Sequence, residues 1–279
     1  MGVASGDGAG RVWSPAPWWL RAFLLVNVVQ DAAIGASGLL SPAHIVIPLK
    51  GLSPPNARFI ASLYLGGGIV ILLAALVRRA VDARIALYSL LAITTLVLAM
   101  TLVYWREFSA DGVPWLWMTT YVADPVVLVL AIGPLGVLRA AAPGRHRLTG
   151  LFAGQAVVFG GAGIALLLAP DMVLDGWPWS LTRLLARVYA AFFLAFAAGA
   201  VLAAFERREA AVRPFLAGSL ALVACTLGIS VLHRGRFDHG PGSWLWFAVL
   251  AAGLALFGFA LVSVLPRSRG RRPVPAAER

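Results

Sequence analysis

The sequence predicts an all-α, polytopic membrane protein in which eight transmembrane helices form two parallel four-helix repeats. Three observations predict this fold: an apolar composition, apolar runs long enough to cross a membrane, and an internal repeat. Of the 279 residues, 60% are hydrophobic and 13% are charged, and the mean hydropathy is +0.85. Soluble domains are about half apolar and a quarter charged. The composition therefore excludes a soluble enzyme, a disordered chain and a small secreted domain held by disulfides.

The chain is strongly basic, with a formal net charge of +11. Its arginines fall in short loops between apolar runs and not on one face of a polar domain, so we expect no nucleic-acid partner. Only Lys50 is a lysine, and this bias, with the many alanines and glycines, is typical of a GC-rich bacterial genome. The single cysteine, Cys225, excludes an intrachain disulfide.

Eight apolar runs approach or exceed the about 20 residues that a transmembrane helix needs. Tryptophan and tyrosine near the ends of these runs fit the headgroup layers of a bilayer. The first run also contains polar residues, and a cleaved signal peptide is the alternative interpretation of this segment. The apolar core of such a peptide, 23–29, would be short. The runs are 18–40, 57–77, 84–105, 115–138, 148–168, 181–205, 212–233 and 243–266.

An internal repeat appears when the chain is aligned with itself at an offset of 129 residues. Residues 57–118 then align without a gap to 186–247, and 18 of the 62 positions are identical. The matches include Arg58 with Arg187. They also include the Trp-Leu-Trp motif, which occurs at 115–117 and again at 244–246. The predicted organisation is an N-terminal segment, two four-helix repeats and a basic tail, at 1–17, 18–140, 148–266 and 267–279.

Basic residues are distributed unequally between the two sides of the predicted bundle. The side with both termini carries 16 of them and the opposite side carries 7, which places both termini in the cytoplasm. An even number of helices per repeat makes the repeats parallel, and we expect a multi-pass protein of the bacterial plasma membrane. The bilayer is the expected partner, with anionic lipid at the tail arginines Arg267, Arg269, Arg271 and Arg272.

Asp31 and Asp124 are the two acidic residues that lie well inside apolar runs. A charge at the bilayer centre costs about 2.5–3.5 kcal/mol on insertion scales, so an intramembrane acid is a functional-site hypothesis. Counted from Pro42 and Trp115 at about 1.5 Å per residue, both acids lie roughly 13–17 Å below the outer boundary. Their similar depth is compatible with one shared site, and the order of the helices, which the sequence does not give, decides whether the two acids meet.

Each acid lies on a polar or small-residue face of its predicted helix. Asn27 precedes Asp31 by one helical turn, and Thr120 and Tyr121 lie one turn before Asp124. We expect Asp31, Asp124, Asn27 and Gln30 to line one cavity that binds a cation, a proton or a small polar solute, with Thr120 and Tyr121 in reach. The alternative is that the carboxyls are protonated, or hydrogen-bonded to Thr120, Tyr121 or an amide, and serve packing alone.

Arg58 and Arg187 occupy matching positions at the outer starts of the second and sixth runs. They are candidates for an anion or headgroup contact, or for a counter-ion to Asp31; the alternative is that they snorkel to the interface. His233, Asp238 and His239 have no spacing that supports a metal site, so we expect no metal, and nothing predicts a cofactor.

Two proline-containing segments, 41–56 and 169–182, are expected to be ordered, non-helical outer loops; a ligand gate is the alternative. The glycines at 66–68 and at 160, 161 and 163 favour close helix packing over flexible points. The stretch Trp177-Pro178-Trp179-Ser180-Leu181-Thr182 with Ala186-Arg187 resembles a pattern in uncharacterised multi-pass membrane proteins of high-GC bacteria. This resemblance implies a bacterial membrane protein and no chemistry.

The sequence contains no phosphate-binding loop, zinc-protease motif, nucleophile elbow or Cys-His framework. These absences remove positive evidence for an enzyme but do not exclude an intramembrane one. We expect no enzymatic activity, and a carrier or permease is the leading functional hypothesis. A non-catalytic membrane scaffold or accessory subunit is the second, and an intramembrane enzyme acting on lipid is the third.

Overall fold

The computed structural model describes residues 15–49, 52–108, 115–135, 144–237 and 240–265. The basic tail at 267–279 and nearly all of the N-terminal segment at 1–17 lie outside these ranges. Lys50, Asp238 and His239 also lie outside them, so the metal hypothesis falls partly on residues that the structure does not describe.

The described chain is helical and contains no β-strand. Short helices occur in the connections: η1 (Pro42–His44), η2 (Ala80–Ala83), α6 (Asp171–Leu174) and η3 (Arg234–Arg236). The long helices are α1 (Trp18–Leu40), α2 (Pro54–Ala75), α3 (Arg84–Val103), α4 (Trp115–Ile132), α5 (Thr149–Leu168), α7 (Arg183–Ala204), α8 (Glu209–Leu232) and α9 (Pro241–Val264).

Seven of the long helices in the described chain are long and apolar enough to cross a membrane. They indicate that the chain is an integral membrane protein in contact with a lipid bilayer. The remaining helix, α4, is apolar but shorter than this standard: its run was predicted to reach residue 138, and the helix ends at Ile132. An eighth span is therefore a proposal.

The prolines of the outer loops do not all exclude helix, and that expectation was wrong. Pro54 and Pro55 begin α2, and Pro42 begins η1. Proline suits the first turn of a helix because the amide hydrogen that it lacks has no partner there and its fixed φ is already helical. In the other loop, Pro170 directly precedes the short helix α6.

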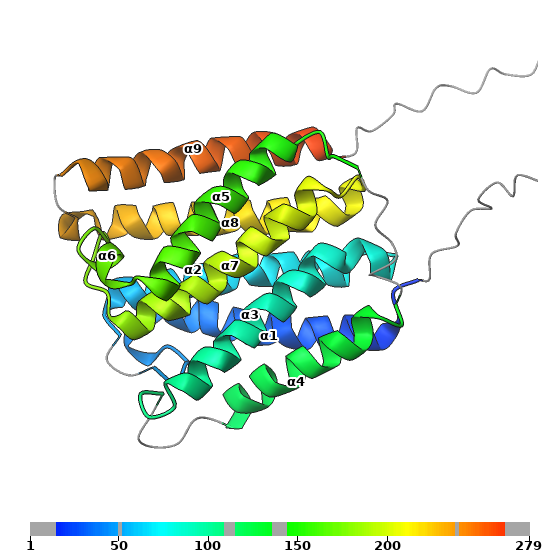
Figure 1. Cartoon of the computed structure of the whole chain (residues 1–279), viewed down its shortest axis with the longest axis horizontal. Helices are drawn as coiled ribbons and strands as arrows, with labels where there is room; N and C mark the ends of the chain where they lie inside the picture. The colour runs from blue at the N-terminus through cyan, green and yellow to red at the C-terminus, as the bar shows by residue number, and fades with distance from the viewer. Residues whose placement is uncertain (1–14, 50–51, 109–114, 136–143, 238–239, 266–279) are drawn as a thin grey trace, which may run out of the picture.

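The helices form a bundle whose centre is made by α2 and α7, the two most buried spans of the described chain. Helix α2 packs on α1 and α8, and α7 packs on α5 and α3. Helices α4 and α9 lie at opposite edges of the bundle, α4 against α3 and α9 against α8 (Figure 1). Each of these two edge helices packs closely on one other long helix.

Glycine permits the close contact between α2 and α8. A Cβ atom on Gly66 would lie 2.7 Å from Leu222 Cβ, and one on Gly218 would lie 2.5 Å from the Gly66 carbonyl oxygen. Such separations are too short for real side chains, so the two backbones approach at glycine. Close packing of Gly66 agrees with the predicted role of the 66–68 cluster.

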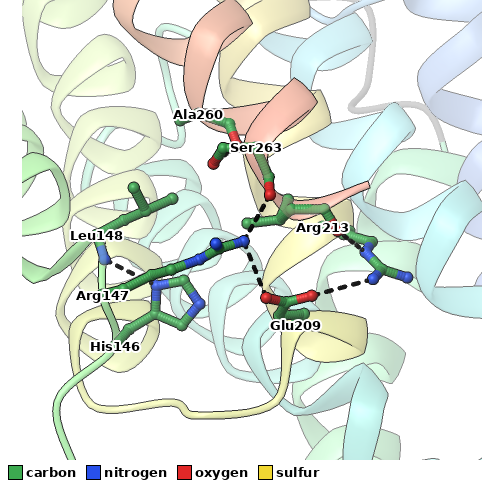
Figure 2. A network of polar contacts seen from close by, with 8 residues as sticks. His146, Arg147, Leu148, Glu209, Arg213, Ala260 and Ser263 are labelled. Atoms are coloured by element: carbon green, nitrogen blue, oxygen red, sulfur yellow. Dashed lines mark hydrogen bonds and ion pairs between the residues drawn. The ribbon is translucent and has the colours of Figure 1, made fainter. Parts of the chain in front are cut away.

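A polar network fixes one end of the second half of the chain (Figure 2). Glu209, at the start of α8, pairs with Arg147 Nη2 at 2.9 Å and with Arg213 Nη2 at 3.2 Å. The two arginines also donate to the last carbonyls of α9: Arg147 to Ser263 O and Arg213 to Val264 O, both at 2.6 Å. Helices α8 and α9 and the segment before α5 thus share one anchoring point.

Candidate functional site

The predicted polar residues lie together in the structure. A cavity of about 60 Å³ lies between α1, α2, α3 and α4, and residues of α7 and α8 complete its wall. Apart from these polar residues, most of its wall is aliphatic and aromatic. All six residues proposed for binding line it: Asn27, Gln30 and Asp31 from α1, and Thr120, Tyr121 and Asp124 from α4.

Helix α1 presents its polar and small-residue face to the bundle. Asn27, Gly35 and Gly38 are buried, whereas Val26 and Val29 on the opposite face are 68% and 70% exposed. The glycines of α2 make room for the acid between the helices, because a Cβ atom on Gly68 would lie only 3.0 Å from Asp31 Cβ.

Polar contacts across the cavity join α1 to α4. The Thr120 hydroxyl donates to Gln30 Oε1 at 2.8 Å. The Asn27 amide donates to the Phe23 carbonyl at 3.2 Å and also hydrogen-bonds to Asp124. Side chains that line the cavity therefore hold the edge helix α4 to α1.

Part of the cavity wall, contributed by α2 and α3, was not predicted from the sequence. Tyr64 of α2 and Tyr121 of α4 share a hydrogen bond of 2.6 Å between their hydroxyls. Ser89 and Thr94 of α3 also line the cavity, and Thr94 is satisfied within its own helix by the Leu90 carbonyl at 2.7 Å. A comparison of the two halves would have found Tyr64, because the aligned residue in the second half is Phe193.

The two carboxyls line the same cavity. No ion pair in the described chain includes either acid. Asp124 is only 4% exposed, and its Oδ2, like Ser89 Oγ, is buried without a hydrogen-bond partner among the described residues. Buried polar atoms are rarely left unpaired, so these two atoms mark a place where a positive or hydrogen-bonding ligand would be stabilised.

Arg58 and Arg187 make other contacts than an ion pair with Asp31. Arg58 donates to His233 Nε2 through Nη1 at 2.8 Å, and to the Leu39 carbonyl through Nε at 3.4 Å. Arg187 donates through Nε to the Leu167 carbonyl at 3.4 Å, and its guanidinium lies 5.3 Å from the centre of the Tyr104 ring. Both arginines thus join helix ends to one another.

The aromatic loop of the second half is held by a residue that the sequence did not single out. Asn56 Oδ1 accepts from Trp179 Nε1 and from the Tyr189 hydroxyl, each at 2.8 Å. The amide nitrogen of the same side chain donates to Ser53 Oγ at 2.9 Å and to the Ser180 carbonyl at 3.0 Å. This network makes the loop at 169–182 an ordered cap over α2 and α7.

Two titratable groups outside the spans are shifted by their neighbours. Burial raises the pKa of Glu206, but hydrogen bonds from Arg208 and the charges of Arg208 and Arg84 outweigh it and hold that pKa below its ordinary value. Burial, with the charges of Arg58 and Arg236, lowers the pKa of His233. A lowered pKa agrees with the hydrogen bond from Arg58, because arginine can only donate and Nε2 must be unprotonated to accept.

The described residues contain no cluster of three or more His, Cys, Asp or Glu side chains that would hold a metal ion. Comparison of the chain with protein-family models, curated proteins and solved structures finds no match. Its class, an integral membrane protein of long apolar helices, thus follows from composition and fold.

Proposed function

We propose that the protein is a carrier that binds a small cation or a proton in the cavity between Asp31 and Asp124. One observation carries the proposal: two carboxyls from different apolar helices, α1 and α4, line one cavity, neither is in an ion pair of the described chain, and one has an unpartnered buried oxygen. Ionisable groups inside a membrane are costly and mark ion or proton pathways.

The size of the cavity limits the ligand. A space of about 60 Å³ holds a few water molecules. Carboxylate, amide and hydroxyl oxygens line one part of it, and such oxygens suit small hard cations. The cavity therefore favours a proton or a dehydrated metal cation over a sugar or an amino acid.

The mechanism that we propose is alternating exposure of the cavity by movement of α4. This helix packs on α3 at the edge of the bundle, and the hydrogen bonds that tie it to α1 and α2 come from residues lining the cavity (Figure 1). A cation between the carboxyls would strengthen the closed arrangement by cancelling their repulsion. Protonation of the carboxyls would release the cation, and so protonation would be the coupling step.

We propose further that the bundle has eight spans in two parallel four-helix repeats, 18–140 and 148–266. Related contacts support this proposal. Trp117 Nε1 donates to Thr101 Oγ1 at 3.3 Å, and 129 residues later Trp246 Nε1 donates to Ser230 Oγ at 2.9 Å. The pairing of α2 with α8 likewise has its counterpart in the pairing of α7 with α3. In this arrangement α4 corresponds to the span α9.

The same proposal places the protein in the bacterial plasma membrane with both termini in the cytoplasm, as the arginine distribution favours. A reporter that is active only in the cytoplasm, fused after residue 279, should be active, and the same reporter inserted between residues 176 and 177 should be silent. The opposite result would reverse the topology.

The binding proposal is tested by thermal unfolding of the detergent-purified protein against lithium, sodium, potassium, magnesium and calcium chlorides at several pH values. A ligand at 100 times its dissociation constant stabilises the folded state by about 2.7 kcal/mol. We expect one cation, or a change of pH, to stabilise the wild type and not Asp124→Asn. Asp171→Asn is the matched control, because Asp171 is an exposed acid outside the cavity. If none of these ions changes the melting temperature, and if pH affects the wild type and Asp124→Asn equally, the result would favour the scaffold hypothesis.

A further inference from the structure

A second cavity lies between α5, α7, α8 and α9. It measures about 160 Å³ and is lined by apolar side chains, with Thr226 as the one polar residue in its described wall. The walls include Phe159 and Ala162 of α5, Phe193 of α7, and Leu250 of α9.

This cavity occupies the position in the second half that the acidic cavity occupies in the first. Seven of its wall residues align with residues of the acidic cavity, at an offset of 128 for α5 and 129 for the later helices. At six of these positions the second half has an apolar residue where the first half has a polar one. The aligned pairs are Gln30 and Val158, Asp31 and Phe159, Tyr64 and Phe193, Thr94 and Val223, Thr120 and Val249, and Tyr121 and Leu250.

The apolar cavity opens toward the surrounding bilayer. Val158 of α5 and Val249 of α9 line it and are 56% and 51% exposed. Helices α5 and α9 pack on different neighbours, α7 and α8 respectively, and the two exposed valines place the opening of the cavity between them. Apolar cavities of about 150 Å³ exclude water and accept hydrocarbon. A cavity of this kind at the depth of the spans is suited to a hydrocarbon chain.

A basic hollow of about 430 Å³ lies next to it along α9. Arg234, Phe237, Ser243 and Trp244 are among the residues that line it. The Phe237 ring lies 5.9 Å from the Trp179 ring, which in turn lies 5.8 Å from Trp246 in the wall of the apolar cavity. Tryptophan beside arginine is typical of the headgroup layer. Positive charge at this end complements a phosphate group.

We propose that these two hollows form one binding site for an anionic glycerophospholipid. Its phosphate lies at Arg234 in the basic hollow, with Arg236 two residues further along the same short helix, η3. One acyl chain enters the apolar cavity between α5 and α9. The site is distinct from the acidic cavity, so this proposal stands or fails independently of the carrier proposal. The second half would thus hold a lipid where the first half holds its ligand.

Native mass spectrometry of the protein released from nanodiscs tests the proposal, with phosphatidylglycerol and phosphatidylcholine in equal amounts. We expect the wild type to retain one phosphatidylglycerol. Ala162→Trp fills the cavity and should lose this lipid. Ile164 lies on the same helix and is 53% exposed, so Ile164→Trp should retain the lipid.

The headgroup is tested separately. The double variant Arg234→Gln/Arg236→Gln should lower the preference for phosphatidylglycerol by about fivefold for each arginine removed. Arg78→Gln, at an exposed arginine of another loop, should leave it unchanged.

A second measurement covers the case in which the tryptophan variant fails to fold. Ala162→Phe is a milder filling variant, and added phosphatidylglycerol should raise the melting temperature of the wild type and of Ile164→Trp but not that of Ala162→Phe. Equal lipid retention by the filling and control variants would overturn the proposal. A wild type that retains no lipid and melts at the same temperature with and without it would also overturn it. Retention of phosphatidylcholine at equal occupancy would overturn the assignment of the headgroup.

Discussion

Arg58 donates a hydrogen bond of 2.8 Å to His233, which lies 175 residues away at the end of α8. A related contact occurs at the aligned positions: Arg187 lies over the ring of Tyr104. Arg187 follows Arg58 by 129 residues, and His233 follows Tyr104 by the same interval. In each case an arginine at the start of one helix reaches a helix end from the other half of the chain. The two contacts are therefore counterparts with different chemistry, as expected for repeats that have diverged.

The first prediction concerns these arginines. Arg58→Gln should lower the free energy of unfolding by about 1.5–3 kcal/mol, because it removes a hydrogen bond from a charged donor. Arg187→Gln should cost less, about 0.5–2 kcal/mol, since its main partner is an aromatic face. Denaturant unfolding in mixed micelles measures both. Arg183→Gln is the control: its pair with Asp171 is largely exposed and should contribute little to stability. Equal losses in all three variants would contradict the assigned contacts.

The second prediction concerns pH. The folded protein lowers the pKa of His233, so the unfolded chain binds more protons there as the pH falls. This contribution to stability is complete above about pH 6.5, the usual pKa of histidine, and is lost progressively below it. His233→Gln should melt with a weaker pH dependence between pH 7 and pH 5 than the wild type. His146, whose pKa is also lowered, makes a similar contribution that remains in the variant. An unchanged pH profile would argue against a neutral His233 bound to Arg58.

The third prediction concerns the close contact of α2 with α8. Gly66→Ala should destabilise the protein by roughly 1–3 kcal/mol, because its methyl group would collide with Leu222. Gly228→Ala is the matched control, since a Cβ atom there meets no described neighbour within 4 Å and alanine favours helix by about 1 kcal/mol. Thermal melting of the two variants should therefore shift in opposite directions. A neutral Gly66→Ala would show that the helices can separate at this point.

The fourth prediction concerns Asn56. Its replacement by leucine leaves Trp179 Nε1 and the Tyr189 hydroxyl buried without their acceptor, at a cost of about 1–3 kcal/mol for each group. The loop over α2 should loosen, and a change in tryptophan fluorescence and faster proteolysis between residues 169 and 182 would report it. Asn56→Asp keeps the acceptor oxygen but loses the donor to Ser180, and it should preserve the indole contact. Equal loosening by both variants would argue that the acceptor is not what orders the loop.

Much of the fold was predictable because a bilayer imposes long apolar helices. Seven of the predicted runs correspond to helices that qualify as spans, most with ends within a few residues, and α4 is the exception. The loops were less predictable. Pro54 was expected to exclude helix, yet it begins α2, because the effect of proline depends on whether it enters the first turn or the interior.

The cavity was predictable in its acids and less so in its remaining wall. Asp31 and Asp124 stand out because charge is rare in apolar runs, whereas Tyr64 is uncharged and differs from its aligned residue, Phe193, only by a hydroxyl. Its hydrogen bond to Tyr121 depends on how α2 faces α4, and helix order is not contained in hydropathy. Asn56 was missed for the same reason, since its partners in the second half of the chain, Ser180 and Trp179, lie more than 120 residues away.

The most direct test of the carrier proposal is cation or proton movement across proteoliposomes, followed with a pH-sensitive dye trapped inside while single salts are added outside. We expect the wild type to dissipate or build a pH gradient with one cation in preference to the others. Asp31→Asn and Asp124→Asn should abolish this signal while remaining folded, and Asp171→Asn should retain it. Wild-type activity that survives in both cavity variants would contradict the central role of the two carboxyls.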